Sequence, residues 1–386
     1  MNMNTNATLP LGRYRHFKGM EYEVLGSATH SESREHLVVY RALYGSFGLF
    51  VRPQAMFLEQ VTRGGITQPR FSYIGPSAVR KLTREAQMHA RAFLLAEARP
   101  LEAALYRMEF EGAPASEVFT ALAAFQNDDG GFGHALEPDW GAPASSVLAT
   151  TTALQHLRHL DAPADHPLVR SAMGWLLRAF DADKMRWPLI PALPTNAPHA
   201  PWWTPGPGHP TWFRQYAVNP RAEILVYLHH WPALADPAIV ETVEADLTRH
   251  YTQSTDALDM NELLCTLRLL DVATLPAPLR DAARAAAQRS LDVTLARDSV
   301  VWESYALQPL HVAPIPLALF APALAELLAA NLDFCIAAQQ DDGSWAPQWS
   351  WSEQHPDAWP AARRAWQGVL TLEAMRSLRA YGRLAL

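Results

Sequence analysis

The spacing of apolar residues changes near Pro76. From Tyr14 to Ile74, short runs rich in Val, Leu, Tyr and Phe are separated by glycines, which is typical of β-strands. The clearest runs are Met20–Leu25, His36–Tyr44 and Gly48–Val51. They predict a small β-barrel-like domain of four or five strands at residues 12–75, after a flexible N-terminus at residues 1–11.

Beyond Pro76 the apolar residues follow helical spacing. Val169, Met173, Leu176, Leu177 and Phe180 lie on one face of a helix. Ser116 and Asp256 are predicted to cap two further helices. Three more helices are predicted at 279–295, 321–339 and 360–382. Residues 80–386 are therefore predicted to form a mainly α domain.

A polar turn with an aromatic residue recurs in this domain. The best copies are QNDDGGFG, ending at Gly133, and QQDDGSW, ending at Trp345, and weaker copies end at Trp187 and Trp302. The spacing fits a repeat of roughly 50 residues, one helical hairpin each, with room for six. We expect the glycines to turn the chain, the acidic pair to cap the next helix and the aromatic residue to fill the gap between hairpins.

Two of these segments resemble known repeats. QNDDGGFG with the following SVLATTTAL is similar to the glycine-rich repeat of protein prenyltransferase β subunits, and the segment Leu332–Trp345 resembles the Q–W motif of squalene–hopene-type cyclases. The resemblance implies an (α/α)6 toroid of the terpenoid cyclase and prenyltransferase superfamily, with an aromatic-lined cavity for isoprenoids. The family's D-x-D-D, D-D-x-x-D and D-x-C motifs are absent from this chain. Whether it is an enzyme therefore stays open.

The N-terminal region carries a second resemblance. YRHFKGMEYEVLG, HSE, LVVYRALYGSFGLFVRP and MF look like a small bacterial family known as domain of unknown function 1653. The resemblance fixes a boundary and implies no activity.

Composition narrows the classes of protein. Apolar residues make up 49% of the chain, the N-terminus is polar, and two widely spaced cysteines rule out a disulfide framework, which fits the cytoplasm. No run is long and apolar enough to predict a membrane span. Residues 1–75 carry a net charge of +3 and the remainder −10, which is unfavourable for nucleic-acid binding.

Carboxylates supply the candidate catalytic groups. Glu137 and Asp139, beside Trp140, follow a glycine turn at an expected cavity mouth, where a dry setting would raise their pKa values. Asp259 shares a helical face with Asp256 and Glu262. The alternative for each is helix capping or surface solvation.

A second candidate group lies further along the chain. Glu303 and His311 are a candidate acid–base pair near Tyr305, and the alternative is an irregular structural segment. The aromatic cluster Trp345, Trp349, Trp351, Trp359 and Trp366 would stack on sugar rings or stabilise carbocations, or would pack between hairpins.

The segment 188–220 is rich in proline and is predicted to be an ordered cap over one end of the domain. Candidate cavity residues are Trp202, Trp203 and Trp212, and Arg214 and Arg221 are the candidate cations for a diphosphate. No protein metal site and no certain cofactor are predicted, and Mg²⁺ is implied only if a prenyl diphosphate is the substrate.

Three functions remain open from the sequence. The first is an isoprenoid-handling enzyme with non-standard acid residues. The second is a non-catalytic scaffold whose β domain binds a partner protein. The third is a carbohydrate-active toroid.

Overall fold

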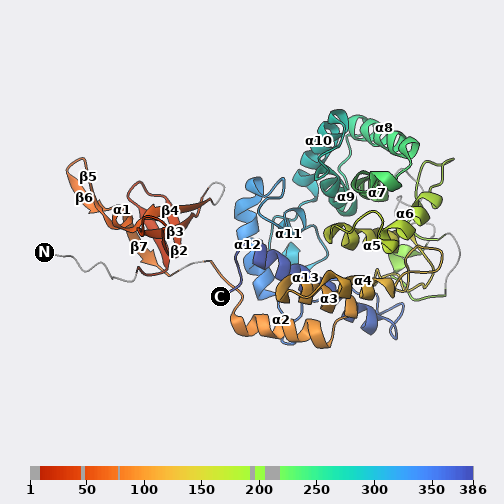
Figure 1. The fold of residues 1–386 in the computed structure, drawn as a ribbon, viewed down its shortest axis with the longest axis horizontal. Helices are drawn as coiled ribbons and strands as arrows, with labels where there is room; N and C mark the ends of the chain where they lie inside the picture. Colours follow the sequence, from red (N-terminus) through yellow and green to blue (C-terminus); the bar gives the residue numbers. More distant parts are fainter. Residues whose placement is uncertain (1–8, 45–47, 77–78, 192–195, 205–217, 386) are drawn as a thin grey trace.

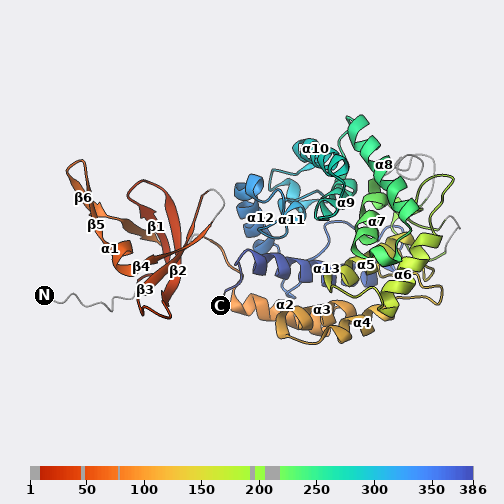
Figure 2. The same ribbon diagram turned by 45° about the horizontal axis from the view of Figure 1, so that its top comes forward.

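The computed structural model describes residues 9–44, 48–76, 79–191, 196–204 and 218–385. It shows an antiparallel sheet domain followed by many helices (Figures 1 and 2). Trp212 and Arg214 of the predicted cap lie outside the described residues, as does most of the predicted flexible N-terminus.

The β domain is built on a five-stranded sheet in the order β4-β3-β2-β1-β7. All pairings in it are antiparallel, and β4 and β7 are its edges. A separate hairpin pairs β5 with β6. The elements are β1 (Gly12–His16), β2 (Glu21–Thr29), β3 (His36–Ala42), β4 (Leu49–Pro53), α1 (Gln54–Leu58), β5 (Gln60–Arg63), β6 (Ile66–Pro69) and β7 (Phe71–Gly75).

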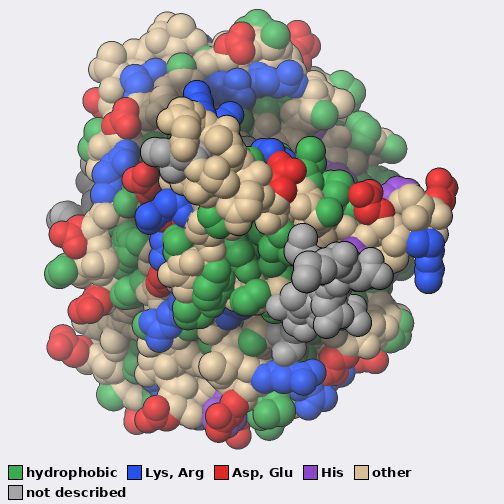
Figure 3. All heavy atoms as spheres, turned by 90° about the vertical axis from the view of Figure 1, so that its left-hand side faces the viewer, with side chains coloured by type: hydrophobic (Ala, Val, Ile, Leu, Met, Phe, Trp, Pro, Cys, Tyr) green, Lys and Arg blue, Asp and Glu red, His purple; other side chains and the backbone are tan. Residues whose placement is uncertain are grey.

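Alternation along the strands creates the core of this domain. In β3 the side chains of Val38, Tyr40 and Ala42 are buried and their neighbours are not. Phe57 of α1 is fully buried, with its ring stacked 4.1 Å from that of Phe71. Some apolar side chains remain exposed, among them Leu49, Phe50 and Val51 of edge strand β4. Hydrophobic side chains are visible on the face shown in Figure 3.

The helical domain follows a short linker. Its α-helices are α2 (Arg84–Ala96), α3 (Pro100–Glu111), α4 (Ala115–Ala123), α5 (Val147–His159), α6 (Pro167–Arg178), α7 (Val218–His230), α8 (Pro237–Gln253), α9 (Met260–Leu270), α10 (Ala277–Thr294), α11 (Pro309–Val312), α12 (Ala325–Ala337) and α13 (Trp359–Ala380). One large apolar core runs through these helices, from Leu82 to Leu378. A different set of residues forms the core of the β domain.

Helices close in sequence pack on one another along the domain. The closest pairs are α2 with α3, α3 with α4, α5 with α6 and α7, α7 with α8 and α9, α8 with α10, α9 with α10 and α11, and α11 with α12. The last helix, α13, packs on α2 and α3. Near the end of the chain, Arg383 Nη1 donates to the carbonyl of Arg80 at 2.8 Å. The two ends of the helical domain therefore meet.

Most predicted helix positions agree with the structure, and two predicted caps were wrong. The helices predicted at 279–295, 321–339 and 360–382 correspond to α10, α12 and α13. The residue before α4 is Pro114, so Ser116 lies inside the helix. Asp259, not Asp256, caps α9, because it forms a reciprocal capping box with Glu262.

The two best polar turns share one geometry. Gly130 and Gly343 have φ angles of +93° and +86°, as a turn of this kind requires. The aspartate before each glycine accepts a hydrogen bond from the backbone N–H two residues further on. Asp129 accepts from Gly131 and Asp342 accepts from Ser344, each at 2.9 Å. The acidic residue therefore closes its own turn instead of capping the next helix, which corrects the sequence prediction.

The aromatic residue of each turn is tied to the helix that follows. The backbone N–H groups of Phe132 and Trp345 donate to the hydroxyls of Thr150 in α5 and Thr371 in α13, each at 3.0 Å. Both aromatic side chains are buried. The two turns are thus equivalent structures about 210 residues apart.

Each turn also packs against the first helix of the next hairpin. A Cβ atom on Gly130 would lie 2.8 Å from the carbonyl oxygen of Ser171 in α6. A Cβ atom on Gly343 would lie 2.4 Å from the carbonyl carbon of His89 in α2. The early turn therefore packs on α6, the helix after α5, and the late turn, which precedes α13, packs on α2, the first helix of the domain.

Candidate functional site

The loop between α4 and α5 holds the first candidate carboxylates in a strained backbone. His134 and Ala135 both have positive φ angles, 55° and 58°, which non-glycine residues rarely adopt. Arg99 Nη1 donates to the carbonyls of Ala135 at 2.9 Å and Leu136 at 3.1 Å. The same guanidinium pairs with the buried carboxylate of Glu102. Arg99 therefore holds the loop that leads to Glu137.

Asp139 lies at the centre of a cluster of tryptophans. Its Oδ1 accepts the indole N–H of Trp351 at 2.7 Å and of Trp366 at 2.9 Å, and its Oδ2 accepts that of Trp349 at 3.1 Å. The side chain is 4% exposed. A carboxylate accepts such bonds better than a neutral acid because hydrogen bonds to a charged group are stronger. The three indoles therefore stabilise the ionised form of Asp139.

The tryptophans come from the far end of the sequence. Trp349 and Trp351 lie in the loop between α12 and α13, and Trp366 lies in α13. Around them, a second apolar cluster joins this loop to the α4–α5 and α6–α7 loops, and it includes Trp140 and Trp203. These candidate cavity residues therefore belong to the wall that encloses Asp139. The buried indole N–H of Trp140 has no hydrogen-bond partner among the described residues.

Burial, charge and hydrogen bonds affect the pKa values of the two carboxyl groups differently. Burial raises the pKa of Glu137 and the charge of Asp139 raises it further, to about 8, while Arg99 opposes the shift. Burial also raises the pKa of Asp139, and there the three indole hydrogen bonds act in the opposite direction. Because only Asp139 has these donors, we assign the proton of the pair to Glu137 at neutral pH. A protonated, half-buried carboxyl group beside a carboxylate can act as a general acid.

Tyr305 and Asp259 lie in the same region. The Tyr305 side chain is 57% exposed, its ring contacts that of Trp349 edge-on at 5.3 Å, and the Asn261 side chain lies near its hydroxyl. Burial and the charges of Asp139, Glu137 and Asp259 raise its pKa. The structure therefore brings four predicted site residues, Glu137, Asp139, Tyr305 and Asp259, to one end of the helical domain. Asp259 uses one carboxylate oxygen to cap α9.

The candidate pair of Glu303 and His311 is not joined in the structure. Glu303 is exposed in a short 3-10 helix, Val301–Glu303. His311 Nδ1 accepts the backbone N–H of Gln308 at 3.1 Å, and burial lowers the pKa of this histidine to about 4. No hydrogen bond or ion pair joins the two side chains in the part of the chain that the structure describes. Their catalytic role stays a prediction.

The described part of the proline-rich segment contributes packing. Trp202 packs against the cluster that holds Trp203, and the His199 ring lies 5.4 Å from that of Trp140. Arg221, the candidate diphosphate cation, is 4% exposed. It donates to the carbonyl of Met185 at 2.9 and 2.6 Å and pairs with Asp246 at 3.7 Å. Its guanidinium therefore supports the wall in this structure.

Polar and charged side chains of α7, α9 and α13 also lie near one another. Glu373 of α13 is exposed, yet burial raises its pKa. A side chain that contacts solvent while surrounded by protein lies in a depression of the surface. Arg268 of α9 acts electrostatically on Glu373 and pairs with Glu223 of α7 at 2.6 Å. The side chains around this depression are therefore charged and polar.

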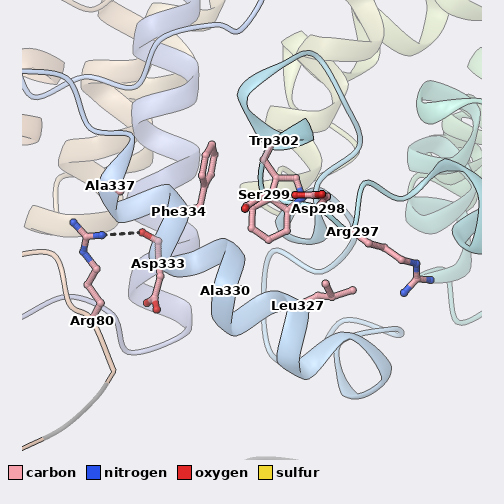
Figure 4. Close-up of a pocket in the computed structure, with 10 residues that line it drawn as sticks. All are labelled: Arg80, Arg297, Asp298, Ser299, Trp302, Leu327, Ala330, Asp333, Phe334 and Ala337. Carbon is pink, nitrogen blue, oxygen red and sulfur yellow. Dashed lines mark hydrogen bonds between the residues drawn. The ribbon is translucent and has the colours of Figure 1, made fainter.

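A surface groove lies apart from the carboxylate pair. It has a volume of about 760 Å³ and runs between α12 and the turn that ends at Trp302. Figure 4 shows Trp302 and Phe334 within it, and Arg80 bonded to the backbone of Asp333. None of the predicted site residues lines this groove.

The described residues contain no group of three or more His, Cys, Asp or Glu side chains placed to hold a metal ion. Among the same residues, no helix combines the length and the apolar character that crossing a membrane would need.

Comparison with known proteins concerns the β domain. Residues 12–73 match a family described as "Protein of unknown function (DUF1653)". A crystal structure of a DUF1653 protein from Bordetella bronchiseptica is 39% identical over 18% of this chain and 92% of that chain, with a TM-score of 0.17. Through this segment the chain belongs to the DUF1653 family. The N-terminal resemblance is thereby confirmed.

The DUF1653 segment ends before the helical domain begins, so it says nothing of the carboxylate site. No curated protein matches the chain. The resemblance of residues 80–386 to terpenoid cyclases and prenyltransferases receives no support from these comparisons and stays a prediction.

Sequence reasoning missed how the tryptophans act in this DUF1653-containing chain. It treated Trp349, Trp351 and Trp366 as stacking or packing groups, whereas their N–H groups all donate to Asp139. The available signal was their clustering after the late polar turn. That signal cannot name the acceptor, which lies more than 200 residues earlier.

Proposed function

We propose that the helical domain is an (α/α)6 toroid with an acid catalytic site at one end. The toroid is supported by the packing of α13 on α2 and α3 and by the equivalent turns of Gly130 and Gly343. In a closed ring the last hairpin meets the first, so its turn packs on α2. Long loops that lead into α5, α7, α11 and α13 would gather at one end and carry the site.

The reaction class rests on one observation, the clamp of three indole N–H groups on Asp139. Asp139 would remain a carboxylate while Glu137 donates a proton to the substrate. The negative charge of Asp139 would then stabilise positive charge that develops near it, and the Trp349, Trp366 and Tyr305 rings would assist. Such a site suits a reaction that passes through a cation-like transition state.

A carbohydrate is the substrate class that the interior favours. Cleavage of a glycosidic bond uses a carboxylic acid to protonate the leaving oxygen and passes through an oxocarbenium-like state. The interior offers Glu373, Arg268 and Asn261, which match hydroxyl groups better than hydrocarbon. Balanced charge, as in the Arg268–Glu223 pair, suits a neutral ligand.

An isoprenoid remains the second candidate because of the aromatic side chains at the mouth. Trp349 contacts Trp366 at 5.0 Å and Tyr305 at 5.3 Å, and such rings stabilise carbocations. Protonation of an alkene would use the same acid, Glu137. The polar interior counts against a long hydrocarbon chain.

Turnover of a mixed substrate panel tests the proposal. Neutral oligosaccharides, polyprenols and prenyl diphosphates are incubated with the protein, with and without Mg²⁺, and products are separated by mass spectrometry. We expect sugar cleavage that Glu137→Gln abolishes with little change in melting temperature, and that falls above about pH 8 as Glu137 loses its proton. Exposed Glu326→Gln is the matched control. Products unaffected by Glu137→Gln would refute the acid role, and no products at all would favour the scaffold reading.

A further inference from the structure

Two helices carry a polar residue two turns beyond the site. In α13, Glu373 follows Trp366 by seven residues, and in α9, Arg268 follows Asn261 by seven. Residues seven apart lie on the same helical face and about 10 Å apart along the axis. Trp366 donates to Asp139 and the Asn261 side chain lies near Tyr305, so both faces point toward the site. Glu373 and Arg268 therefore lie in a second layer below it.

The side chains of this layer act on one another although they come from helices that are not closely packed. Arg376 and Arg268 act electrostatically on Glu373, although α9 and α13 are not among the closely packed helix pairs of the described chain. His156 of α5 likewise responds to Arg376 of α13. Groups that interact without their helices packing together border a common interior.

Two members of the layer have unused hydrogen-bonding capacity. Neither the carboxyl group of Glu373 nor the ring of His156 has a hydrogen-bond partner among the described residues, and Glu373 is exposed. Burial and nearby cations lower the pKa of His156 to about 3, so its imidazole is neutral and offers one donor and one acceptor. Polar groups in a confined interior are normally satisfied by water or by a ligand.

The two arginines at this layer are already paired with carboxylates. Arg268 Nη1 donates to Glu223 Oε2 at 2.6 Å, and Glu223 also accepts the hydroxyl of Tyr227. Arg376 pairs with the carboxylate of Glu109. The layer therefore has little net charge with which to attract an ion, and it offers hydrogen bonds instead.

We propose that Glu373, His156 and the Arg268–Glu223 pair form a second binding subsite, which holds hydroxyl groups of the ligand remote from the bond at Glu137. The subsite rests on the proposed function. It deepens that function by specifying an oligosaccharide, because a monosaccharide cannot reach both layers. Binding energy from this remote end would position the reacting bond at the acid.

Binding as a function of sugar length tests the subsite. Glucose, α- and β-linked disaccharides and the matching pentasaccharides are titrated calorimetrically into full-length Glu137→Gln protein, which is expected not to cleave them. We expect pentasaccharide to bind more tightly than disaccharide. Glu373→Gln and His156→Gln should each reduce the affinity advantage of the pentasaccharide about tenfold, as loss of one good hydrogen bond would. Exposed Glu326→Gln should leave the gain unchanged.

The outcomes separate the two proposals. If sugars bind and the length-dependent gain survives in both interior variants, the subsite is overturned and the acid site stands. If no sugar binds in any variant, the carbohydrate assignment fails together with the subsite. Circular dichroism and melting curves of Glu373→Gln, whose side chain is exposed, guard against a folding defect.

Discussion

Replacement of Asp139 by asparagine gives the sharpest test of the indole clamp. The change keeps the shape of the side chain and removes its charge and one acceptor oxygen. Asparagine can direct its carbonyl oxygen at Trp351 and Trp366, whose indoles share Oδ1 of Asp139. Its NH₂ group must then face the indole N–H of Trp349, where Asp139 offered Oδ2. Two donors would oppose one another.

The cost follows from these three bonds. A hydrogen bond to a charged group contributes about 1.5–3 kcal/mol and one between neutral groups about 0.5–1.5 kcal/mol, so two weakened bonds lose about 2–3 kcal/mol. One unsatisfied indole N–H costs about 1–3 kcal/mol more. Relief from burying a carboxylate returns part of this loss. We expect Asp139→Asn to lower the free energy of unfolding by about 2–4 kcal/mol.

The assay is urea unfolding followed by circular dichroism, with exposed Asp341→Asn as the matched control. A double-mutant cycle with Trp349→Phe identifies the cause. Phenylalanine has no N–H to oppose asparagine, so Asp139→Asn should cost about 1–2 kcal/mol less in the Trp349→Phe background. Removal of the Asp139 charge should also lower the pKa of Glu137, which carbon-detected NMR of the carboxyl group can follow.

An Asp139→Asn protein as stable as the wild type would refute this reasoning. It would mean that Asp139 is already neutral in the folded protein, with the indoles bonded to an uncharged acid. Equal costs of Asp139→Asn with and without the Trp349→Phe change would show that the opposing donors are not the source of the loss.

Three further changes have defined outcomes. The folded pKa of Glu137 lies above its unfolded value near 4.5, so its contribution to stability is complete below pH 4.5 and is lost as the pH rises through about 8. Over this range the free energy of unfolding should fall by up to about 1.4 kcal/mol per pH unit. Glu137→Gln should remove that slope in urea titrations, and an unchanged slope would show that another group carries the raised pKa. Gly343→Ala should destabilise the protein by more than about 2 kcal/mol in thermal unfolding, because its Cβ atom would meet the backbone of His89. Gly64 also has a positive φ angle but has open space around it, so Gly64→Ala should cost only about 1 kcal/mol. Equal costs would contradict the packing of the Gly343 turn on α2. Thr371→Val should cost about 1 kcal/mol by leaving one buried N–H unpaired, and hydrogen exchange at Trp345 should then accelerate.

Local pattern was sufficient to predict the elements. Alternating burial in β3 follows from its sequence, and α10, α12 and α13 begin and end within a few residues of their predicted positions. The caps were harder to predict, because several polar residues compete at each helix start. Asp259, and not Asp256, caps α9, because Glu262 lies three residues after Asp259 and completes the capping box.

At the candidate site the residues could be predicted from the sequence, but their separate roles could not. Glu137 and Asp139 were predicted from a carboxylate-rich loop after a glycine turn, and the structure places Tyr305 and Asp259 near them. The separate roles of the two carboxyl groups could not be predicted. They depend on which group receives the indole donors, and that is a matter of distance in space.

The sequence by itself determined the two-part organisation, the helices and strands, and the polar turns, because each follows from residues within about ten positions of one another. The tertiary structure alone decided that Trp349, Trp351 and Trp366 surround Asp139 and that the charge of Arg268 acts on Glu373. These contacts join residues about 100 to 230 positions apart. Packing of the helices brings them together, and burial there shifts pKa values that the same residues would not show in an unfolded chain.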